Sequence, residues 1–309
     1  MSRGGKITRR TLLAAGSASL LEPRLARSAE TTRLRVGATL HAYFSWVANI
    51  VGTAADLVPV IPANADPHSF QPTPEEVRVL SELDAVIVNG LGHDAFIGPM
   101  LRAADADLTV INANDGSPLI RDRSSDEEGN GTPNAHSFLS ITAAAGQIHH
   151  IARSLASLDA ANGDLFQENA TIYRRRLRHL LAAGLSELDG LDHRAVKIAV
   201  VHDGYDYLLS ELGLSAHAVV QPRHGIDPSP RQLADTIRRL KESETDILFA
   251  EAAYAPRMAG LVAEATGARI ERLSHLYDGD YSAGFFEREM AANIETIVRA
   301  VRLALADRA

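Results

Sequence analysis

The sequence contains no cysteine in its 309 residues. This absence excludes disulfide bonds, thiolate metal ligands and a lipidated cysteine, so we expect a protein that is not a lipoprotein. Basic residues are also fewer than acidic ones: the chain has 31 Lys and Arg but 39 Asp and Glu, and its formal net charge is −8. An acidic chain of this kind argues against nucleic acid as a partner and favours cations.

Long hydrophobic runs are missing as well, and the one apolar stretch at the N-terminus is too short to span a bilayer. Residues 11–21 form this stretch, and Lys6, Arg9 and Arg10 precede it. We expect residues 1–28 to be an export signal, of the twin-arginine type or of the general secretory type. Its removal takes away six basic residues and Glu22, so the net charge changes from −8 to −13. A soluble periplasmic protein is the prediction.

Strand-like and helix-like segments alternate along the rest of the chain. We expect strands at 34–40, 57–61, 85–88, 108–111, 196–201, 216–220, 247–250 and 269–273, with helices between most of them and long helices at 140–158 and 163–190. This alternation predicts an α/β protein of two lobes, each a mostly parallel sheet flanked by helices and joined by one long helix. The expected boundaries are 29–162 for the N-terminal lobe, 163–191 for the linking helix and 192–309 for the C-terminal lobe, both lobes contributing to a metal site.

Three histidines lie where strand-like runs give way to loops or helix starts, namely His68, His136 and His202. Ligands of open parallel sheets bind outside the carboxyl ends of strands, and neutral imidazole is a good ligand for zinc and its neighbours. Two of these histidines fall in one half and the third in the other, which predicts a metal site in the cleft between the lobes. His41 and His93 also follow strands, but we do not assign them as ligands.

Several motifs, taken in order, resemble a known family. They are Asp66-Pro67-His68-Ser69-Phe70, Asn89-Gly90-Leu91-Gly92, His136, His202-Asp203-Gly204-Tyr205, Asp227-Pro228-Ser229-Pro230 and Phe249-Ala250-Glu251. Together they resemble the metal-binding solute-binding proteins of ABC transporters (cluster A-I, also called cluster 9), and within them the periplasmic zinc-uptake type. The similarity covers nearly all of residues 34–306.

The resemblance implies a receptor that captures Zn(II) and delivers it to an inner-membrane ABC permease and its ATPase, with a zinc chaperone as a further possible partner. It also implies a stiff helix between the lobes. Zinc-type members carry histidine where manganese-type members commonly carry glutamate, so His202 points to zinc. Nitrogen-rich shells of low coordination number suit zinc better than manganese. We expect a monomer.

The fourth ligand is where the chain departs from the family pattern, because Ser274 stands where an aspartate is usual. Serine is a poor zinc ligand. The alternatives are Asp278 or Asp280 after a local shift, His275, or a water molecule.

Two other functions compete with zinc transport. One is a manganese or iron receptor of the same fold. The other is a zinc hydrolase, since three histidines and an open position also describe catalytic zinc. Against it, no general base stands in a motif beside a ligand, although Glu251 or Asp203 could be nominated. We therefore expect a transport protein and not an enzyme.

Overall fold

A computed structural model describes residues 33–121, 131–220, 229–251 and 256–308. Residues 33–309 form one compact unit. The expected export signal, the segment 122–130 with its four acidic residues, and the motif residues Asp227 and Pro228 lie outside the described residues.

The first half contains a parallel sheet in the order β2-β1-β3-β4. Its strands are β1 (Leu34–Ala38), β2 (Ala55–Pro59), β3 (Ala85–Val88) and β4 (Thr109–Asn112), and its helices are α1 (His41–Val51), α2 (Pro74–Val79) and α3 (Ile97–Ala104), with a short 3-10 turn η1 (Leu80–Glu82). Helix α2 begins with a capping box, in which Thr73 and Glu76 bond each other's backbone, and with Pro74 in its first turn. These are the start signals that the sequence shows at this point.

The second half repeats this arrangement with a parallel sheet in the order β6-β5-β7-β8. Its strands are β5 (Ile198–Val200), β6 (Ala216–Val219), β7 (Ile247–Glu251) and β8 (Arg269–Leu273), and its shorter helices are α6 (Asp206–Glu211), α7 (Pro230–Glu242) and α8 (Pro256–Thr266), with the 3-10 turns η4 (His193–Ala195) and η5 (Asp203–Tyr205). In both orders the first strand of the half has neighbours on either side, so each sheet has a switch point at which ligands bind.

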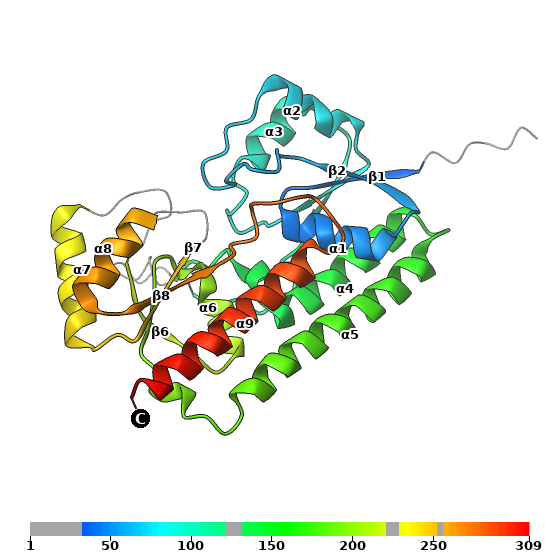
Figure 1. Ribbon diagram of the computed structural model, residues 1–309. Coiled ribbons are helices and arrows are strands. Elements are labelled where there is room, and N and C mark those ends of the chain that lie inside the picture. Colours follow the sequence, from blue (N-terminus) through cyan, green and yellow to red (C-terminus); the bar gives the residue numbers. More distant parts are fainter. Residues whose placement is uncertain (1–32, 122–130, 221–228, 252–255, 309) are drawn as a thin grey trace, which may run out of the picture. The chain divides into compact units, whose positions relative to one another are not determined.

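Three long helices run along both halves of the chain (Figure 1). A 3-10 turn, η3 (Ser137–Leu139), leads into α4 (Ile141–Leu158), which is followed by α5 (Gly163–Leu188) and, at the end of the chain, by α9 (Phe285–Ala306). Helix α5 contacts α4, α1 and α9, and α9 also contacts α1 and β8. The chain therefore passes from its first half to its second along packed helices.

One hydrophobic core is shared by both halves. Ile87 of the first sheet and Phe249 of the second belong to the same buried cluster, which α1, α4, α5 and α9 complete. Alternate residues of each strand point the other way: Val86 packs in a second cluster under α2 and α3, and Leu248 in a third under α7 and α8. Strands buried on both faces explain the continuous apolar runs of the sequence.

The structure confirms the predicted fold class: two parallel four-stranded sheets flanked by helices, with a long helix α5. The lobe boundaries at 162 and 191 stay predictions. Within the described residues, no helix combines the length and apolar character that crossing a membrane requires.

Candidate metal centre

Five histidines converge where strands of both sheets end. His68 follows β2, His93 follows β3, His136 precedes η3, His202 follows β5 and His275 follows β8. Two groups of ring nitrogens lie within 4.8 Å of one another, His68 with His93 and His136, and His136 with His202 and His275. His136 is thus common to a group from the first half and a group that includes the second half.

The shortest separations involve Nε2 of His136, which lies 3.1 Å from Nε2 of His202 and 3.4 Å from Nε2 of His68. The rings of His68 and His93 are in edge contact, with centroids 4.2 Å apart. His68 is exposed, whereas the other four histidines are buried. The centre therefore has one solvent-facing imidazole and four that the protein encloses.

A buried polar network sets the loops that carry His93 and His136. Asp94, next to His93, accepts hydrogen bonds from Thr39 Oγ1 at 2.6 Å and from the backbone N–H of Asn89 at 2.7 Å. The amide of Asn89 donates to the carbonyl of Ala135 at 3.0 Å, next to His136. The loop after β3 is consequently tied to the segment before η3, and this brings His93 and His136 together.

His136 lies at the centre of the cluster and is held in one orientation. Its Nδ1 lies 2.7 Å from Oδ1 of Asn134. Burial, reinforced by the neighbouring histidines His202, His275, His93 and His68, lowers the pKa of His136 well below its usual value. The ring is therefore neutral near pH 7, which is the form that binds a metal.

His202 has a carboxylate at its other nitrogen. Nδ1 of His202 lies 3.2 Å from Oδ1 of Asp203, and both side chains are buried. A ligand histidine usually donates its second N–H to a carboxylate or carbonyl, which fixes the tautomer and directs the free lone pair at the metal. The sequence pair His202-Asp203 thus places a candidate ligand next to a carboxylate that approaches its second nitrogen.

His275 approaches the backbone of Gly204 very closely. A Cβ atom at position 204 would lie 2.5 Å from Nε2 of His275 and 3.3 Å from Cδ2 of His136. Any larger residue at position 204 would displace one of these rings, so the glycine allows His275 to enter the centre.

The chain turns away from the centre just after His275. Leu276 has a left-handed backbone, with φ 63°, and the following residues run to α1, where the carbonyl of Gly279 accepts a hydrogen bond from His41 Nε2 at 3.0 Å. Asp278 and Asp280 are exposed on this stretch, and neither belongs to the two histidine groups of the described residues. Of the alternatives for the fourth position, His275 is the one that lies in the centre.

The structure brings together His68, His136 and His202, as the sequence predicts, and adds His93. In the sequence, His93 is marked by its position shortly after a buried strand and after two glycines, Gly90 and Gly92. Both glycines have positive φ in the structure. His41 also lies next to a strand end, but it stacks on Tyr281 with ring centroids 4.0 Å apart. It holds the loop after β8 and takes no place in the two histidine groups.

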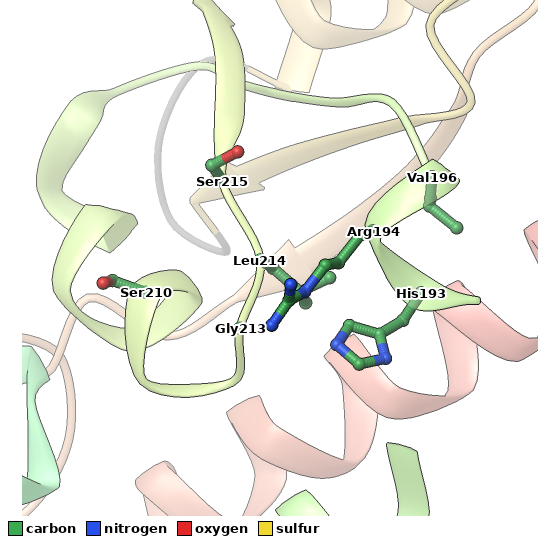
Figure 2. Close-up of a pocket in the computed structure, with 7 residues that line it drawn as sticks. All are labelled: His193, Arg194, Val196, Ser210, Gly213, Leu214 and Ser215. Atoms are coloured by element: carbon green, nitrogen blue, oxygen red, sulfur yellow. The ribbon is translucent and has the colours of Figure 1, made fainter. Parts of the chain in front are cut away.

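A separate pocket of about 350 Å³ lies in the second half (Figure 2). It is lined by His193, Arg194, Val196, Ser210, Gly213, Leu214 and Ser215. None of the five converging histidines lines it, and His193 points its Nδ1 at the carbonyl of Leu191, 3.0 Å away. We assign this pocket no part in metal binding.

Comparison with known proteins identifies the family. The sequence profile described as "Zinc-uptake complex component A periplasmic" matches residues 36–300. The chain belongs to this family. It is a periplasmic metal-binding substrate-binding protein of an ABC transporter, not an enzyme, and such proteins work with a permease and an ATPase.

Solved structures of a Pseudomonas aeruginosa substrate-binding protein, FpvC, are similar to the family member described here. The complex with Ni²⁺ is 41% identical, covers 88% of this chain and 98% of FpvC, and superposes with a TM-score of 0.82. The complex with Mn²⁺ is 42% identical over 88% and 99% of the two chains, with a TM-score of 0.81.

More distant relatives carry other metals in their names. The "Iron ABC transporter substrate-binding lipoprotein MtsA" of Streptococcus pyogenes is 23% identical over 79% of this chain and 80% of its own length. A structure of ZnuA, 24% identical over 87% and 99% of the two chains with a TM-score of 0.74, shares the fold. The family relationship therefore establishes metal transport but does not identify the metal. The metal has to be inferred from the residues of the candidate centre.

Proposed function

We propose that this protein captures Zn(II) in the periplasm with the imidazoles of His68, His93, His136, His202 and His275 and delivers the ion to its ABC importer. In this proposal Asp278 and Asp280 are not ligands. The observation that carries it is the convergence of the five histidines, four of them buried, from both halves of the chain.

The orientation of the rings favours a cation between them. The Nδ1 atoms of His136 and His202 lie 2.7 Å and 3.2 Å from oxygens of Asn134 and Asp203. With the ring protons on Nδ1, the lone pair of each Nε2 points inward. Two lone pairs that face each other at 3.1 Å repel, and a cation between them replaces that repulsion by coordination. An ion about 2.1 Å from each nitrogen places two neighbouring ligands roughly 3.0–3.5 Å apart, which agrees with the separations around His136.

The donor atoms support zinc over manganese or iron. An all-imidazole shell has no hard oxygen donors, and Mn²⁺ and Fe²⁺ stand lowest in the usual order of affinity for such sites. The manganese and iron alternatives therefore rank below zinc, although FpvC has been solved with Mn²⁺ and the relative MtsA is named for iron.

A second candidate cargo is Ni(II). Five histidines are more than a four-coordinate zinc shell uses, and nickel accepts a higher coordination number with nitrogen ligands. The Ni²⁺ complex of FpvC, at 41% identity, supports this alternative.

Binding is expected to draw the two groups of histidines slightly together. The five ring nitrogens do not lie within 4.8 Å of one another as a single group in the described residues. One ion at about 2.1 Å from every ligand requires all pairs to lie within about 4.2 Å. The shared core of α1, α4, α5 and α9 resists a wide hinge motion, so we propose a shift of loops by about an ångström or less.

The remaining parts of the proposal concern the whole protein. We propose that residues 1–28 direct export, that residues 29–162 and 192–309 form the two metal-binding lobes around a linking helix at 163–191, and that the exported protein is a soluble monomer without a lipid anchor. Several relatives are named lipoproteins, whereas this chain has no cysteine to which a lipid could be attached.

Titration of the metal-free protein with Zn²⁺, Ni²⁺, Fe²⁺ and Mn²⁺ against a competing chelator tests the choice of metal. Zinc is expected to bind most tightly and manganese most weakly. A tighter affinity for nickel would make the second candidate the cargo, and a tighter affinity for manganese or iron would refute both.

Replacement of His202 tests the ligand set. His202→Ala is expected to weaken zinc binding by about tenfold or more, equivalent to about 1.4 kcal/mol, because it removes an inner ligand. The matched control is His179→Ala, which removes an exposed histidine of α5. Equal affinity of the two variants would remove His202 from the site.

A further inference from the structure

Asn134 uses every polar group of its side chain and backbone at the junction of the two halves. It is almost fully buried, with 1% of its surface exposed. Its backbone N–H donates to the carbonyl of Ile120 at 2.9 Å, and its own carbonyl accepts from the hydroxyl of Tyr207 at 3.0 Å. The side-chain amide is left to act on the metal centre.

The direction of that amide is fixed by a neighbour that can only donate. Oδ1 of Asn134 lies 2.9 Å from the backbone nitrogen of His136, which carries a hydrogen and accepts none. Oδ1 is therefore the acceptor, and Nδ1 of His136, 2.7 Å from the same oxygen, must hold the ring proton. The consequence is a single tautomer of His136, in which the lone pair is on Nε2, the atom nearest His202 and His68.

The other end of the same amide reaches the second half. Nδ2 of Asn134 donates to the backbone carbonyl of Asp203 at 3.1 Å. The carboxylate of Asp203 in turn lies 3.2 Å from Nδ1 of His202. One buried side chain thus joins the ring of His136 to the residue that orients His202.

We propose that Asn134 is a positioning residue of the metal centre, which holds His136 in its Nδ1-protonated tautomer and in register with His202. This inference rests on the proposed role of His136 and His202 as ligands. The partners of ligand histidines typically contribute about ten- to a hundredfold to metal affinity.

The first test is a measurement on the unaltered, metal-free protein. In protein with ¹⁵N-labelled histidine, two-dimensional NMR of the imidazole nitrogens reports which nitrogen of each ring carries the proton. His136, assigned by its loss in His136→Gln, is expected to carry it on Nδ1. A proton on Nε2 overturns the proposal, whatever the metal affinity turns out to be.

The second test uses two substitutions of Asn134. Asn134→Ala removes all three side-chain hydrogen bonds, two to His136 and one to Asp203, and is expected to mix the tautomers of His136 and to weaken zinc binding by about tenfold or more. Asn134→Asp keeps an oxygen acceptor for both N–H groups of His136 but loses the donor to the carbonyl of Asp203, so it is expected to retain the tautomer and to recover part of the affinity. The control is Asn169→Ala, which deletes a hydrogen bond to the carbonyl of Ile50 away from the histidines.

The outcomes separate positioning from simple structural support. Asn134 supports the fold alone if Asn134→Ala gives any one of three results. These are the parent tautomer, zinc binding within about threefold of the parent, or a loss of affinity no larger than that of Asn134→Asp. If Asn134→Ala does not fold, Asn134→Asp decides: loss of the Nδ1 proton in that variant overturns the proposal, and its retention supports it. A parent protein that binds none of the metals refutes the proposed function and leaves the tautomer result intact.

Discussion

At the scale of single residues, the centre depends on which side chain follows β8 into it. His275 lies within 4.8 Å of His136 and His202 through its ring nitrogen, whereas Asp278 and Asp280 are exposed. In the proposed site an imidazole thus takes the place of the carboxylate that the family pattern suggests. An all-nitrogen donor set of this kind favours zinc and nickel over manganese.

Replacement of these three residues one by one checks this assignment. His275→Ala is expected to weaken zinc binding by about tenfold or more, and Asp278→Ala and Asp280→Ala by less than about threefold, since only the first removes a ligand. Affinities come from chelator competition at constant ionic strength, because removal of nearby acids also alters the attraction of cations. A tenfold loss in either aspartate variant, with none in His275→Ala, would restore the aspartate as the fourth ligand.

Gly204 gives a second prediction at this scale. Gly204→Ala places a methyl group 2.5 Å from Nε2 of His275, closer than van der Waals contact allows, so that ring must move out of the centre. We expect zinc affinity to fall by about tenfold. The control is Gly146→Ala in helix α4, where the added methyl group meets no atom within 4 Å. It is expected to leave affinity unchanged and to raise stability, since alanine favours helix by up to about 1 kcal/mol.

At the scale of secondary-structure elements, the N-terminus of helix α4 is hydrogen-bonded to a residue from the other half. The carboxylate of Glu211, at the end of α6, accepts hydrogen bonds from the backbone of Ile141 at 2.8 Å, the backbone of Thr142 at 2.6 Å and the hydroxyl of Ser140 at 2.8 Å. A negative charge at a helix N-terminus also interacts favourably with the helix dipole. This contact fastens the two halves close to His136.

Removal of that carboxylate is expected to destabilise the protein. Glu211→Ala should lower the free energy of unfolding by about 1–2 kcal/mol, in the range found for lost helix caps. Urea unfolding followed by circular dichroism measures the change. Glu168→Ala, an exposed acid within α5, is the comparison and should change stability by less than about 0.5 kcal/mol. Equal effects of the two substitutions would show that the contacts of Glu211 add nothing beyond those of an exposed acid.

The strands are the elements that the sequence predicts best. All eight expected strands are present, and their bounds differ from the expected ones by a few residues. The expected strand 34–40 ends at Ala38, because the chain turns at residues 39 and 40 to begin α1 at His41. The alternation of Ile87 and Phe249 toward the shared core with Val86 and Leu248 toward the outer helices explains why such strands read as unbroken apolar runs.

At the scale of the whole molecule, buried histidines make stability depend on pH. Burial and, to a smaller extent, the neighbouring histidines lower the pKa of His136. Burial also lowers the pKa of His41, although hydrogen bonds to the backbone act in the opposite direction. The unfolded chain therefore takes up more protons than the folded chain at mildly acidic pH. By linkage, the free energy of unfolding falls as the pH drops below the unfolded value of 6.5 and is unaffected by these two groups well above it.

Urea unfolding of the metal-free protein at pH 7.5 and at pH 5.5 measures this dependence. Each such histidine contributes up to about 1.4 kcal/mol per pH unit between its folded and unfolded pKa values. The decrease should be smaller in His136→Gln, which has one titrating group fewer. Zinc affinity is expected to fall over the same range, since protons compete for the ligands. Unchanged stability between the two pH values would contradict the burial of these histidines.

The sequence by itself determined the two parallel sheets, the long helices and three of the converging histidines, because hydrophobic periodicity locates strand ends and strand ends of parallel sheets meet. It gave His93 little weight and left open whether His275, Asp278 or Asp280 joins them. The tertiary structure decided these points, through Asn89, which ties the loop after β3 to the segment of His136, and through Leu276, which turns the chain away just after His275. Such loop directions depend on hydrogen bonds between segments far apart in the sequence, and no local pattern encodes them.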